Sequence, residues 1–495
     1  MATEGKSMAT RDDDNKAAPT AQPPFVAGKT IFIAGAGIAG SALAASIAHL
    51  CNPAFPPPTV ILFDRDPPHA SQQRSGESYT LSLSAYSEAG GLVVLRHLGL
   101  LDRVLARAAA GRRADGSDGS FKIWDRDWSE RERTPRQAVL GVPTPSLRIS
   151  RKQLRQVLHE LVESWDHGHI EWNTRCVAAE RLESGRVRVR LLRQQSSSSS
   201  SSSFSPKAEG QQQKAEGQQQ KTEGQQQKTE GQQQEAEIQH LDCDLLIAAD
   251  GANSQLRALF RPNDTLQYTG RVLRLALSRL DAAAAPPSPL HSARDWGFML
   301  SDKDTSCFFS PADDNTILWA VGSKEPSPAP EMQRQCSSSA RAVVARAHRL
   351  GHGLFAEPFD SLVKATDLDT VMCINARHKK PFCHNDQLLA LPIVFIGDSN
   401  HAQSPFSGSG ANLALADGWD LAQQLCRHAT LAEAVACYDG VSEPRAQNVF
   451  AAGRAMAGAG ASSRWRHWLC MVAMSLRRCV AAPYWFWCLL KRAVE

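Results

Sequence analysis

The chain has 495 residues, about three times the length of a typical domain, so it should form more than one folding unit. Hydrophobic residues make up 42% of it, and 55 basic against 51 acidic residues give a formal net charge of +4. These values exclude wholesale disorder and argue against a dedicated nucleic-acid binder, which carries a strong basic excess. The 12 cysteines form no Cys-x-x-Cys pair, so no metal site is predicted, and scattered cysteines favour a reducing, intracellular compartment such as the cytoplasm.

The first predicted elements form a strand, a glycine-rich turn and a helix. The strand, 31–33, is a continuous apolar run, as expected when both faces of a strand are buried. Gly35, Gly37 and Gly40 follow, and their spacing predicts a tight turn, close approach of a pyrophosphate, and a helix packed closely on the sheet. The next strand ends in Asp64, 24 residues after Gly40, where an acid can hold a ribose hydroxyl. The pattern predicts a dinucleotide-binding unit.

Two segments are too polar to fold on their own. Residues 1–27 have no apolar stretch after a basic start, which indicates a disordered N-terminal segment and not a secretory signal. Residues 194–239 contain a run of serines and then a repeated seven-residue unit, Lys-Ala/Thr-Glu-Gly-Gln-Gln-Gln. The unit has no apolar residue except alanine, which excludes a coiled-coil seam. Because strand-like sequences flank this disordered insert at 187–191 and 245–247, we expect it to lengthen one hairpin turn.

Two further strand–turn–helix patterns follow. One apolar strand ends at Asp250 and Gly251, after which polar residues open a helix. A later strand delivers Gly397 and Asp398 into a glycine-rich loop that ends at a helix over 413–425. The N–H groups at the start of that helix can stabilise negative charge on a ligand. The same loop contains His401, Pro405, Gly408, Gly410, Ala411 and Asn412.

The last segment of the chain, 464–495, is an aromatic and basic tail. It holds four of the 11 tryptophans, and its six basic residues against one acid give it a charge of +5. Its two apolar runs, 468–476 and 479–490, are each shorter than the ~20 residues that a membrane-spanning helix needs. Aromatic side chains with flanking cations are typical of a membrane interface, and a helix packed on the body or on a partner explains them equally well.

Taken together and in this order, the three glycine motifs resemble the FAD-dependent aromatic-hydroxylase type of flavoprotein monooxygenase. This family includes para-hydroxybenzoate hydroxylase, salicylate hydroxylase and the tetracycline-inactivating monooxygenases. The resemblance covers about residues 29–430, apart from the insert. It implies an α/β fold in which a Rossmann-like FAD-binding domain is interleaved with a substrate domain built on a mostly antiparallel sheet, with a C-terminal helical tail. The implied units are 28–193 with 240–262 and 391–430 for FAD, 263–390 for substrate, 431–463 as a helical segment and 464–495 as the tail.

The resemblance also implies roles for individual residues. On the adenosine side of FAD, it implies that Gly35, Gly37 and Gly40 bind the pyrophosphate and that Asp64 binds the ribose. On the flavin side, it implies that Gly397 and Asp398 bind the ribityl-phosphate part, and that Gly408, Gly410, Ala411 and Asn412 lie at the pyrimidine side of the ring. Arg74 and Arg151 are implied to lie near the cofactor, and Asp250 and Gly251 belong to a motif implicated in binding both FAD and NAD(P)H. Arg151 sits in the segment 147–155, where it precedes a predicted helix. His401 and Pro405 are the candidate catalytic residues, and His401 has two open interpretations, a proton relay or a loop-ordering hydrogen bond.

In the resembling family, NAD(P)H binds briefly and reduces FAD, and a flavin hydroperoxide formed with O2 transfers one oxygen atom to a small molecule. The implied function is therefore hydroxylation of an aromatic or polyketide-like compound, in keeping with secondary metabolism. The sheet over the flavin should contain strands at 272–276, 296–300, 307–310 and 316–321. Aromatic residues cluster there, for which a place in the sheet core is the main alternative to substrate contact. No residue stands out as a base for substrate activation.

Two other functions remain open at this stage. A flavin epoxidase of a lipophilic terpenoid or polyketide suits a tail that contacts a membrane. A non-catalytic flavin-binding interaction protein would use the Ser/Gln-rich insert as its binding arm. A flavin halogenase is disfavoured because the sequence has no Trp-x-Trp-x-Ile-Pro segment.

Overall fold

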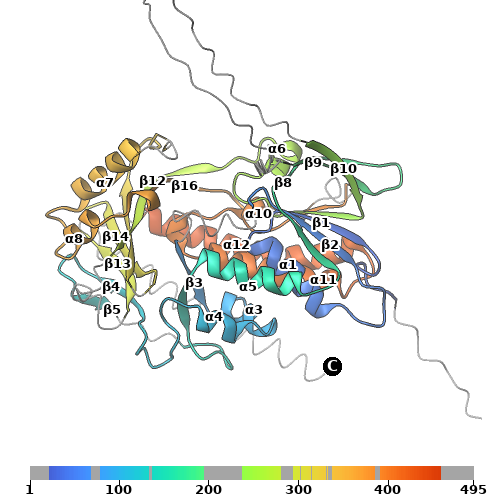
Figure 1. Ribbon diagram of the computed structural model, residues 1–495, viewed down its shortest axis with the longest axis horizontal. Helices are drawn as coiled ribbons and strands as arrows, with labels where there is room; N and C mark the ends of the chain where they lie inside the picture. The colour runs from blue at the N-terminus through green and yellow to red at the C-terminus, as the bar shows by residue number, and fades with distance from the viewer. Residues whose placement is uncertain are drawn as a thin grey trace, which may run out of the picture.

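The computed structural model describes residues 22–67, 79–132, 137–193, 237–279, 294–301, 303–313, 315–330, 332, 337–384 and 391–458. Its first unit contains a five-stranded parallel sheet in the order β17-β11-β1-β2-β7, of which β1 and β2 are labelled on the right of Figure 1. The strands are β17 (Ile393–Phe395), β11 (Leu245–Ala248), β1 (Thr30–Ala34), β2 (Thr59–Phe63) and β7 (Gly168–Glu171). Side chains on both faces of β1 and β11 are buried, which explains why these strands read as continuous apolar runs.

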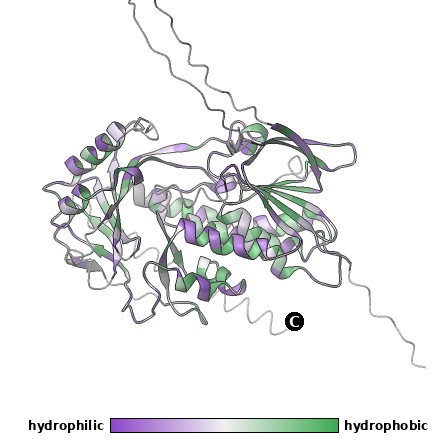
Figure 2. Cartoon of the chain, in the orientation of Figure 1, coloured by the Kyte–Doolittle hydropathy of each residue, from purple (hydrophilic) through white to green (hydrophobic). Residues whose placement is uncertain are grey.

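Helices cover one face of the parallel sheet and a smaller sheet covers the other. The helices are α1 (Ile38–Leu50), α5 (Arg151–Glu163) and α11 (Gly410–Leu425), with α3 (Gly91–His97), α4 (Leu101–Ala106) and α12 (Leu431–Gly458) packed beyond them. The smaller sheet contains β8 (Thr174–Arg181), β9 (Val187–Arg193) and β10 (Glu237–Cys243). Apolar colour in Figure 2 is concentrated between these layers.

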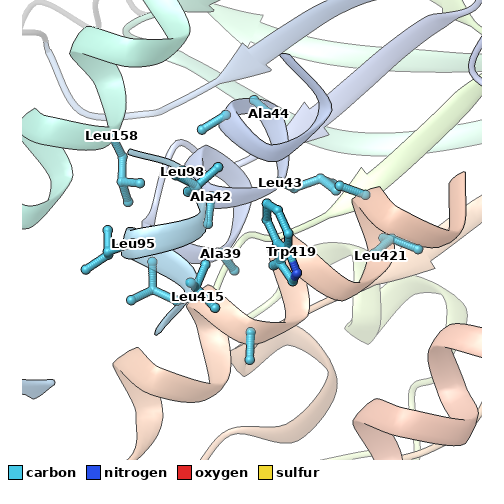
Figure 3. Close-up of a cluster of buried hydrophobic side chains, with 14 of the residues drawn as sticks. Ala39, Ala42, Leu43, Ala44, Leu95, Leu98, Leu158, Leu415, Trp419 and Leu421 are labelled. Atoms are coloured by element: carbon cyan, nitrogen blue, oxygen red, sulfur yellow. The ribbon is translucent and has the colours of Figure 1, made fainter. Parts of the chain in front are cut away.

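The contact between α1 and α11 fixes the two glycine-rich loops relative to each other. A Cβ on Gly418 would lie 2.6 Å from the backbone nitrogen of Leu43, so only glycine permits this approach of the helices. Around it, Ala39, Leu43 and Trp419 form part of a continuous apolar cluster (Figure 3). The two helices therefore start at fixed positions beside the same edge of the sheet.

The second unit is a seven-stranded sheet in the order β16-β12-β15-β14-β13-β4-β5. Its strands are β16 (Met372–His378), β12 (Gln267–Arg279), β15 (Thr316–Lys324), β14 (Thr305–Pro311), β13 (Trp296–Leu300), β4 (Phe121–Trp124) and β5 (Glu130–Glu132). All neighbours are antiparallel except β13 and β4. This confirms the mostly antiparallel substrate domain, and β4 and β5 show that the chain before residue 150 contributes to it.

The two faces of this sheet have different neighbours. Helices α7 (Ser337–Gly351) and α8 (Phe359–Lys364) pack on one face over Phe309 and Trp319, so these two aromatics belong to the core. Phe308 lies on the opposite face with Leu275 and Leu318. That face is turned toward the two-stranded sheet of β3 (Thr80–Ser84) and β6 (Ser146–Ser150).

The structure corrects two segment boundaries and confirms one connection. Residues 22–27 were predicted to be disordered, but Val26 is buried and the Phe25 N–H donates to the His428 carbonyl oxygen at 2.7 Å. Residues 237–239 were assigned to the insert, but they extend β10 because they pair with β9. The predicted hairpin is confirmed, since Arg193 and Glu237 are antiparallel partners. The rest of the insert lies outside the described residues.

The described part of the predicted helical segment 431–463 forms α12, Leu431–Gly458. The aromatic tail, 464–495, lies outside the described residues. Among the helices that the structure describes, none combines the length and the apolar character needed to cross a membrane.

Candidate functional site

The first glycine motif forms an open cradle at the start of α1. Gly35 has φ +112°, and a Cβ there would lie 2.4 Å from the Ala249 carbonyl oxygen, so this turn requires glycine. A Cβ on Gly40 would lie 2.1 Å from the Gly35 carbonyl oxygen, which shows how closely the helix packs on the turn. A Cβ on Gly37 would meet nothing within 4 Å. Gly37 directly precedes α1 and has no side chain to cap the first N–H groups of the helix. Those N–H groups can therefore bind an anionic ligand.

Asp64 orders this turn from the end of β2. Its carboxylate accepts hydrogen bonds from the Ala36 N–H at 3.0 Å, the Asp66 N–H at 3.0 Å and the Arg155 guanidinium at 3.2 Å. Burial raises the pKa of Asp64, and the positive charge of Arg155 opposes that change. Asp64 therefore lies at the predicted position, and much of its hydrogen-bonding capacity is already used within the loop.

Helix α5 supplies residues that the sequence analysis missed. Arg155 and His159 both contact the Ala36 carbonyl oxygen, the latter at 2.9 Å through Nε2. Burial lowers the pKa of His159 to about 4. Both follow Arg151 at helical intervals of four residues, so one face of α5 is turned toward the cradle. This periodicity was the signal that could have identified them.

The Asp250 motif ends the neighbouring strand β11. Asp250 Oδ2 accepts from the N–H groups of Gln255 at 2.8 Å and Leu256 at 3.3 Å, which caps α6 (Gln255–Phe260). Oδ1 is buried and has no hydrogen-bond partner among the described residues, and burial raises the pKa of this acid. Gly251 follows with φ +82°. The Asp250 Cα would lie 3.3 Å from a Cβ on Gly35, so the first two motifs are in direct contact.

The third motif meets the first at Gly397. This glycine has φ +60°, and a Cβ on it would lie 2.9 Å from the Ala39 Cβ in the first turn of α1. The short helix α10 (Asp398–His401) begins directly after it (Figure 1). The Asp398 side chain is accessible to solvent, but nearby protein atoms desolvate it and raise its pKa, while His401 and Arg151 lower it. The structure thus brings Arg151 and Asp398 to the same site from separate elements.

His401 is turned away from solvent into a buried ionic network. Its Nε2 lies 2.6 Å from Asp417 Oδ2, which also accepts from the Gly397 N–H at 2.8 Å. The other carboxylate oxygen accepts from Ser442 at 2.8 Å and from Arg445 at 2.9 Å. This geometry supports the loop-ordering interpretation of His401. Asp417, Ser442 and Arg445 were missed because they lie on α11 and α12, far along the chain.

The loop before α11 leaves a second helix N-terminus open. Pro405 begins a 3-10 turn, Pro405–Ser407, and Gly408 follows with φ +62°. Neither Gly408 nor Gly410 would place a Cβ within 4 Å of another group, and Ser409 gives α11 no side-chain cap. Ala411 is buried in the apolar cluster beneath.

The Asn412 side chain is occupied by protein contacts. Its Oδ1 accepts from the N–H groups of Ser84 at 2.9 Å and Gly91 at 3.0 Å, and its Nδ2 donates to the Ser82 carbonyl oxygen at 2.9 Å. These bonds fix α11 to β3 and α3. Arg74, the last predicted residue, lies outside the described residues.

A buried arginine joins this site to the substrate-domain sheet. Arg148 on β6 is 4% exposed and donates to Ser82 at 2.7 Å and to Ser310 of β14 at 2.9 Å. It also donates to Thr80, and its guanidinium lies 5.0 Å from the ring centre of Phe308. No carboxylate forms an ion pair with it among the described residues, and burial lowers its pKa to about 9. Arg148 could not be identified from the sequence because an arginine in an alternating strand is normally exposed.

Comparison with known proteins identifies a family and a shared fold. A family model described as an FAD binding domain matches residues 29–451. Monooxygenase cfoF of Aspergillus candidus is 35% identical over 422 residues, which cover 85% of this chain and 89% of the relative. The structure of Klebsiella pneumoniae HpxO complexed with FAD and uric acid has a TM-score of 0.61 at 18% identity and covers 90% of this chain and 94% of its own. The structure of P. aeruginosa PqsL in complex with 2-aminobenzoylacetate has a TM-score of 0.60 at 17% identity, and the match covers 88% of this chain and 98% of PqsL. At such identities the two structures show the fold alone.

Proposed function

Because the chain belongs to the FAD binding domain family and is an FAD-dependent monooxygenase, we propose that it uses NAD(P)H and O2 to hydroxylate an aromatic or polyketide-like small molecule. The observation that carries this proposal is the convergence of the three motifs beside an apolar sheet face. Gly35 contacts Ala249 and Asp250, and Gly397 contacts Ala39, so three loops far apart in the sequence form one edge. Ligands of open α/β sheets bind at this edge, outside the carboxyl ends of the strands.

The residues present fit FAD. The uncapped start of α1 at Gly37 suits the pyrophosphate, and the accessible Asp398 suits a ribityl hydroxyl. Arg151 stands near enough to Asp398 to alter its pKa, so it can contact the same part of the cofactor. The uncapped start of α11 after Gly408 can stabilise negative charge on the flavin ring. When bound, FAD supplies the electron-transfer and oxygen chemistry, and the protein supplies position, charge and exclusion of water.

The proposed substrate class rests on the sheet face opposite α7 and α8. That face is apolar and partly buried, with Phe308, Leu275 and Leu318 among its side chains. Flat conjugated molecules pack well against such a surface. Proteins with the same fold hold uric acid and 2-aminobenzoylacetate, which are small conjugated compounds. We propose the same general class of substrate here.

The test combines cofactor retention with turnover. We expect Asp398→Ala to lose bound FAD, because the accessible carboxylate of α10 would bind FAD through its side chain and no backbone group can replace that contact. Asp166→Ala, which changes an exposed acid in the turn after α5, is the matched control and should retain FAD fully. With the wild-type protein, a panel of aromatic and polyketide compounds should include members that stimulate NADPH oxidation and gain one oxygen atom.

The outcomes separate the alternatives. Unchanged FAD content in Asp398→Ala would contradict the assigned binding mode. FAD binding with no stimulated oxidation by any compound would favour a non-catalytic flavoprotein. An epoxide product from a terpenoid or polyketide would identify the epoxidase.

For location, we propose a cytoplasmic enzyme whose tail, 464–495, contacts a membrane surface. The tail's charge of +5 and its four tryptophans support this proposal. The full chain should sediment with anionic lipid vesicles, and a chain that ends at residue 463 should not. Equal recovery of both chains in the supernatant would contradict it.

A further inference from the structure

Three potential metal ligands meet on the outer side of the substrate domain. His348 and His352 lie on α7, and Asp360 lies in the first turn of α8. Their ligand atoms all lie within 4.8 Å of one another. His352 Nδ1 is 2.6 Å from Asp360 Oδ2, and His348 Nε2 is 3.1 Å from Asp360 Oδ1.

The positions of these side chains are set by the packing of the two helices. Residues four apart on a helix share one face, and the two imidazole rings are stacked with centres 4.9 Å apart. Helix α7 is anchored by the buried Ala347, and α8 is anchored by the buried Phe359 and Leu362. Little rearrangement is therefore needed to bring the ligands around an ion, which lowers the entropic cost of binding.

Two of the ligand atoms lack the partners that buried polar atoms normally have. His348 Nε2 and Asp360 Oδ1 are both shielded from solvent, yet neither makes a hydrogen bond among the described residues. They face each other at 3.1 Å without the geometry of a hydrogen bond. Buried polar atoms are rarely left unpaired, and an ion between the two would satisfy both.

We propose that His348, His352 and Asp360 bind one zinc ion, with a fourth position left for water. Two imidazoles and a carboxylate form a ligand set that zinc accepts in tetrahedral geometry, whereas magnesium requires mostly oxygen ligands. Arg341 and Lys364 line the adjoining recess between the helices together with His348. These cations weaken long-range attraction of any metal, so affinity must come from coordination bonds, which also favours zinc over magnesium.

The site lies apart from the flavin cradle and does not depend on the proposed function. In Figure 1, α7 and α8 lie at the opposite end of the molecule from α1 and the parallel sheet. A bound ion would join the two helices that cover Phe309 and Trp319. It would therefore act on the stability of the substrate domain and not on the chemistry at the flavin.

The experiment measures zinc binding by the full chain after chelator treatment and desalting. Wild-type protein, His352→Ala and His169→Ala are dialysed against zinc sulfate, and bound zinc is counted per chain. His169 is the matched control: its side chain is 65% exposed against 64% for His352, and it also pairs with a carboxylate, that of Glu171 at 3.1 Å. No cluster of three ligands includes His169 among the described residues.

Wild type and His169→Ala should each bind one more zinc per chain than His352→Ala, and their melting temperatures should rise with zinc. Because losing an outer-shell partner alone weakens metal sites by roughly 10–100-fold, loss of a direct ligand should have at least that effect. Asp360→Asn should behave like His352→Ala, and FAD content should be the same in all four proteins. Equal zinc stoichiometry in all of them, or equal binding of magnesium, would overturn the proposal.

Discussion

The buried carboxylate of Asp417 offers the sharpest test of how the third glycine loop is held. Asp417 is fully buried on α11 and accepts hydrogen bonds from Gly397, His401, Ser442 and Arg445. Asp417→Asn keeps the shape of the side chain and removes its charge. Since asparagine replaces one carboxylate oxygen with an NH2 group, one pair of donors, either Gly397 with His401 or Ser442 with Arg445, loses its acceptor.

The size of the effect follows from burial. Removing one partner of a buried ion pair typically costs about 3–5 kcal/mol, because the remaining charge stays desolvated. Arg445 retains the carboxylate of Asp420, and His401 can lose its proton, so both cations have a way to reduce the penalty. We therefore expect a loss near the lower end, about 3 kcal/mol of unfolding free energy. A domain of ordinary stability, roughly 5–15 kcal/mol, would still fold.

The assay is urea unfolding of the FAD-free protein together with measurement of FAD retention. We expect Asp417→Asn to lose stability and to bind FAD weakly, because Gly397 and His401 position the loop that carries Asp398. Asp242→Asn is the control, since Asp242 forms a partly exposed pair with Arg188 and should lose far less stability than Asp417→Asn. If Asp417→Asn loses less than about 1 kcal/mol and retains FAD, the network does not hold the loop.

The network also predicts a pH dependence. Burial lowers the pKa of His401, but the charge and hydrogen bond of Asp417 more than offset this and raise it above 6.5. Burial raises the pKa of Asp417, but His401 and Arg445 outweigh it and hold the pKa well below 3.8. The contribution of His401 to the free energy of unfolding is complete below pH 6.5 and is lost as pH rises through the pKa that His401 has in the folded protein. The carboxylate's contribution is complete above pH 3.8 and is lost as pH falls through its folded pKa. The stability difference between wild type and Asp417→Asn should therefore be largest between pH 3.8 and pH 6.5.

Three further variants test the cradle and the domain contact. Gly40→Ala should destabilise the fold by about 1–3 kcal/mol because its Cβ would overlap the Gly35 carbonyl oxygen, whereas Gly37→Ala should leave urea unfolding unchanged and lower FAD affinity, measured by flavin fluorescence titration. Arg148→Lys keeps a charge but loses the planar fork that spans Ser82 and Ser310, so we expect normal FAD content with kcat/KM reduced about tenfold; unchanged turnover would show that this contact does not position the substrate sheet.

The glycine pattern could be predicted because backbone sterics fix it locally. Gly35 needs a positive φ and Gly40 needs the absence of a Cβ, and both requirements come from the turn itself. The strands around them follow from continuous burial of apolar side chains. Their order in the sheet, with β1 between β11 and β2, was not part of the prediction, because it depends on contacts between segments far apart in the sequence.

Long-range partners could not be predicted from such local rules. His401 of α10 and Arg445 of α12 bind opposite oxygens of Asp417 on α11. The pairing of Arg445 with Asp417 depends on how α12 crosses α11, and no sequence spacing encodes that crossing. Arg148 shows a second limit, because an alternating strand pattern places its arginine in solvent unless another domain covers it. The ligand cluster of α7 and α8 was missed because its third member, Asp360, comes from a different helix than the two histidines.

The acids of the three motifs divide by what their oxygens already bind. Asp64 holds the turn before α1, and Asp250 caps α6, so both carboxylates are engaged with backbone N–H groups. The Asn412 side chain is likewise committed to β3 and α3. Asp398 differs because its side chain is accessible to solvent. Most of the motif residues therefore shape the loops so that backbone N–H groups can meet a ligand, and Asp398 is the motif acid whose removal should affect the ligand more than the fold.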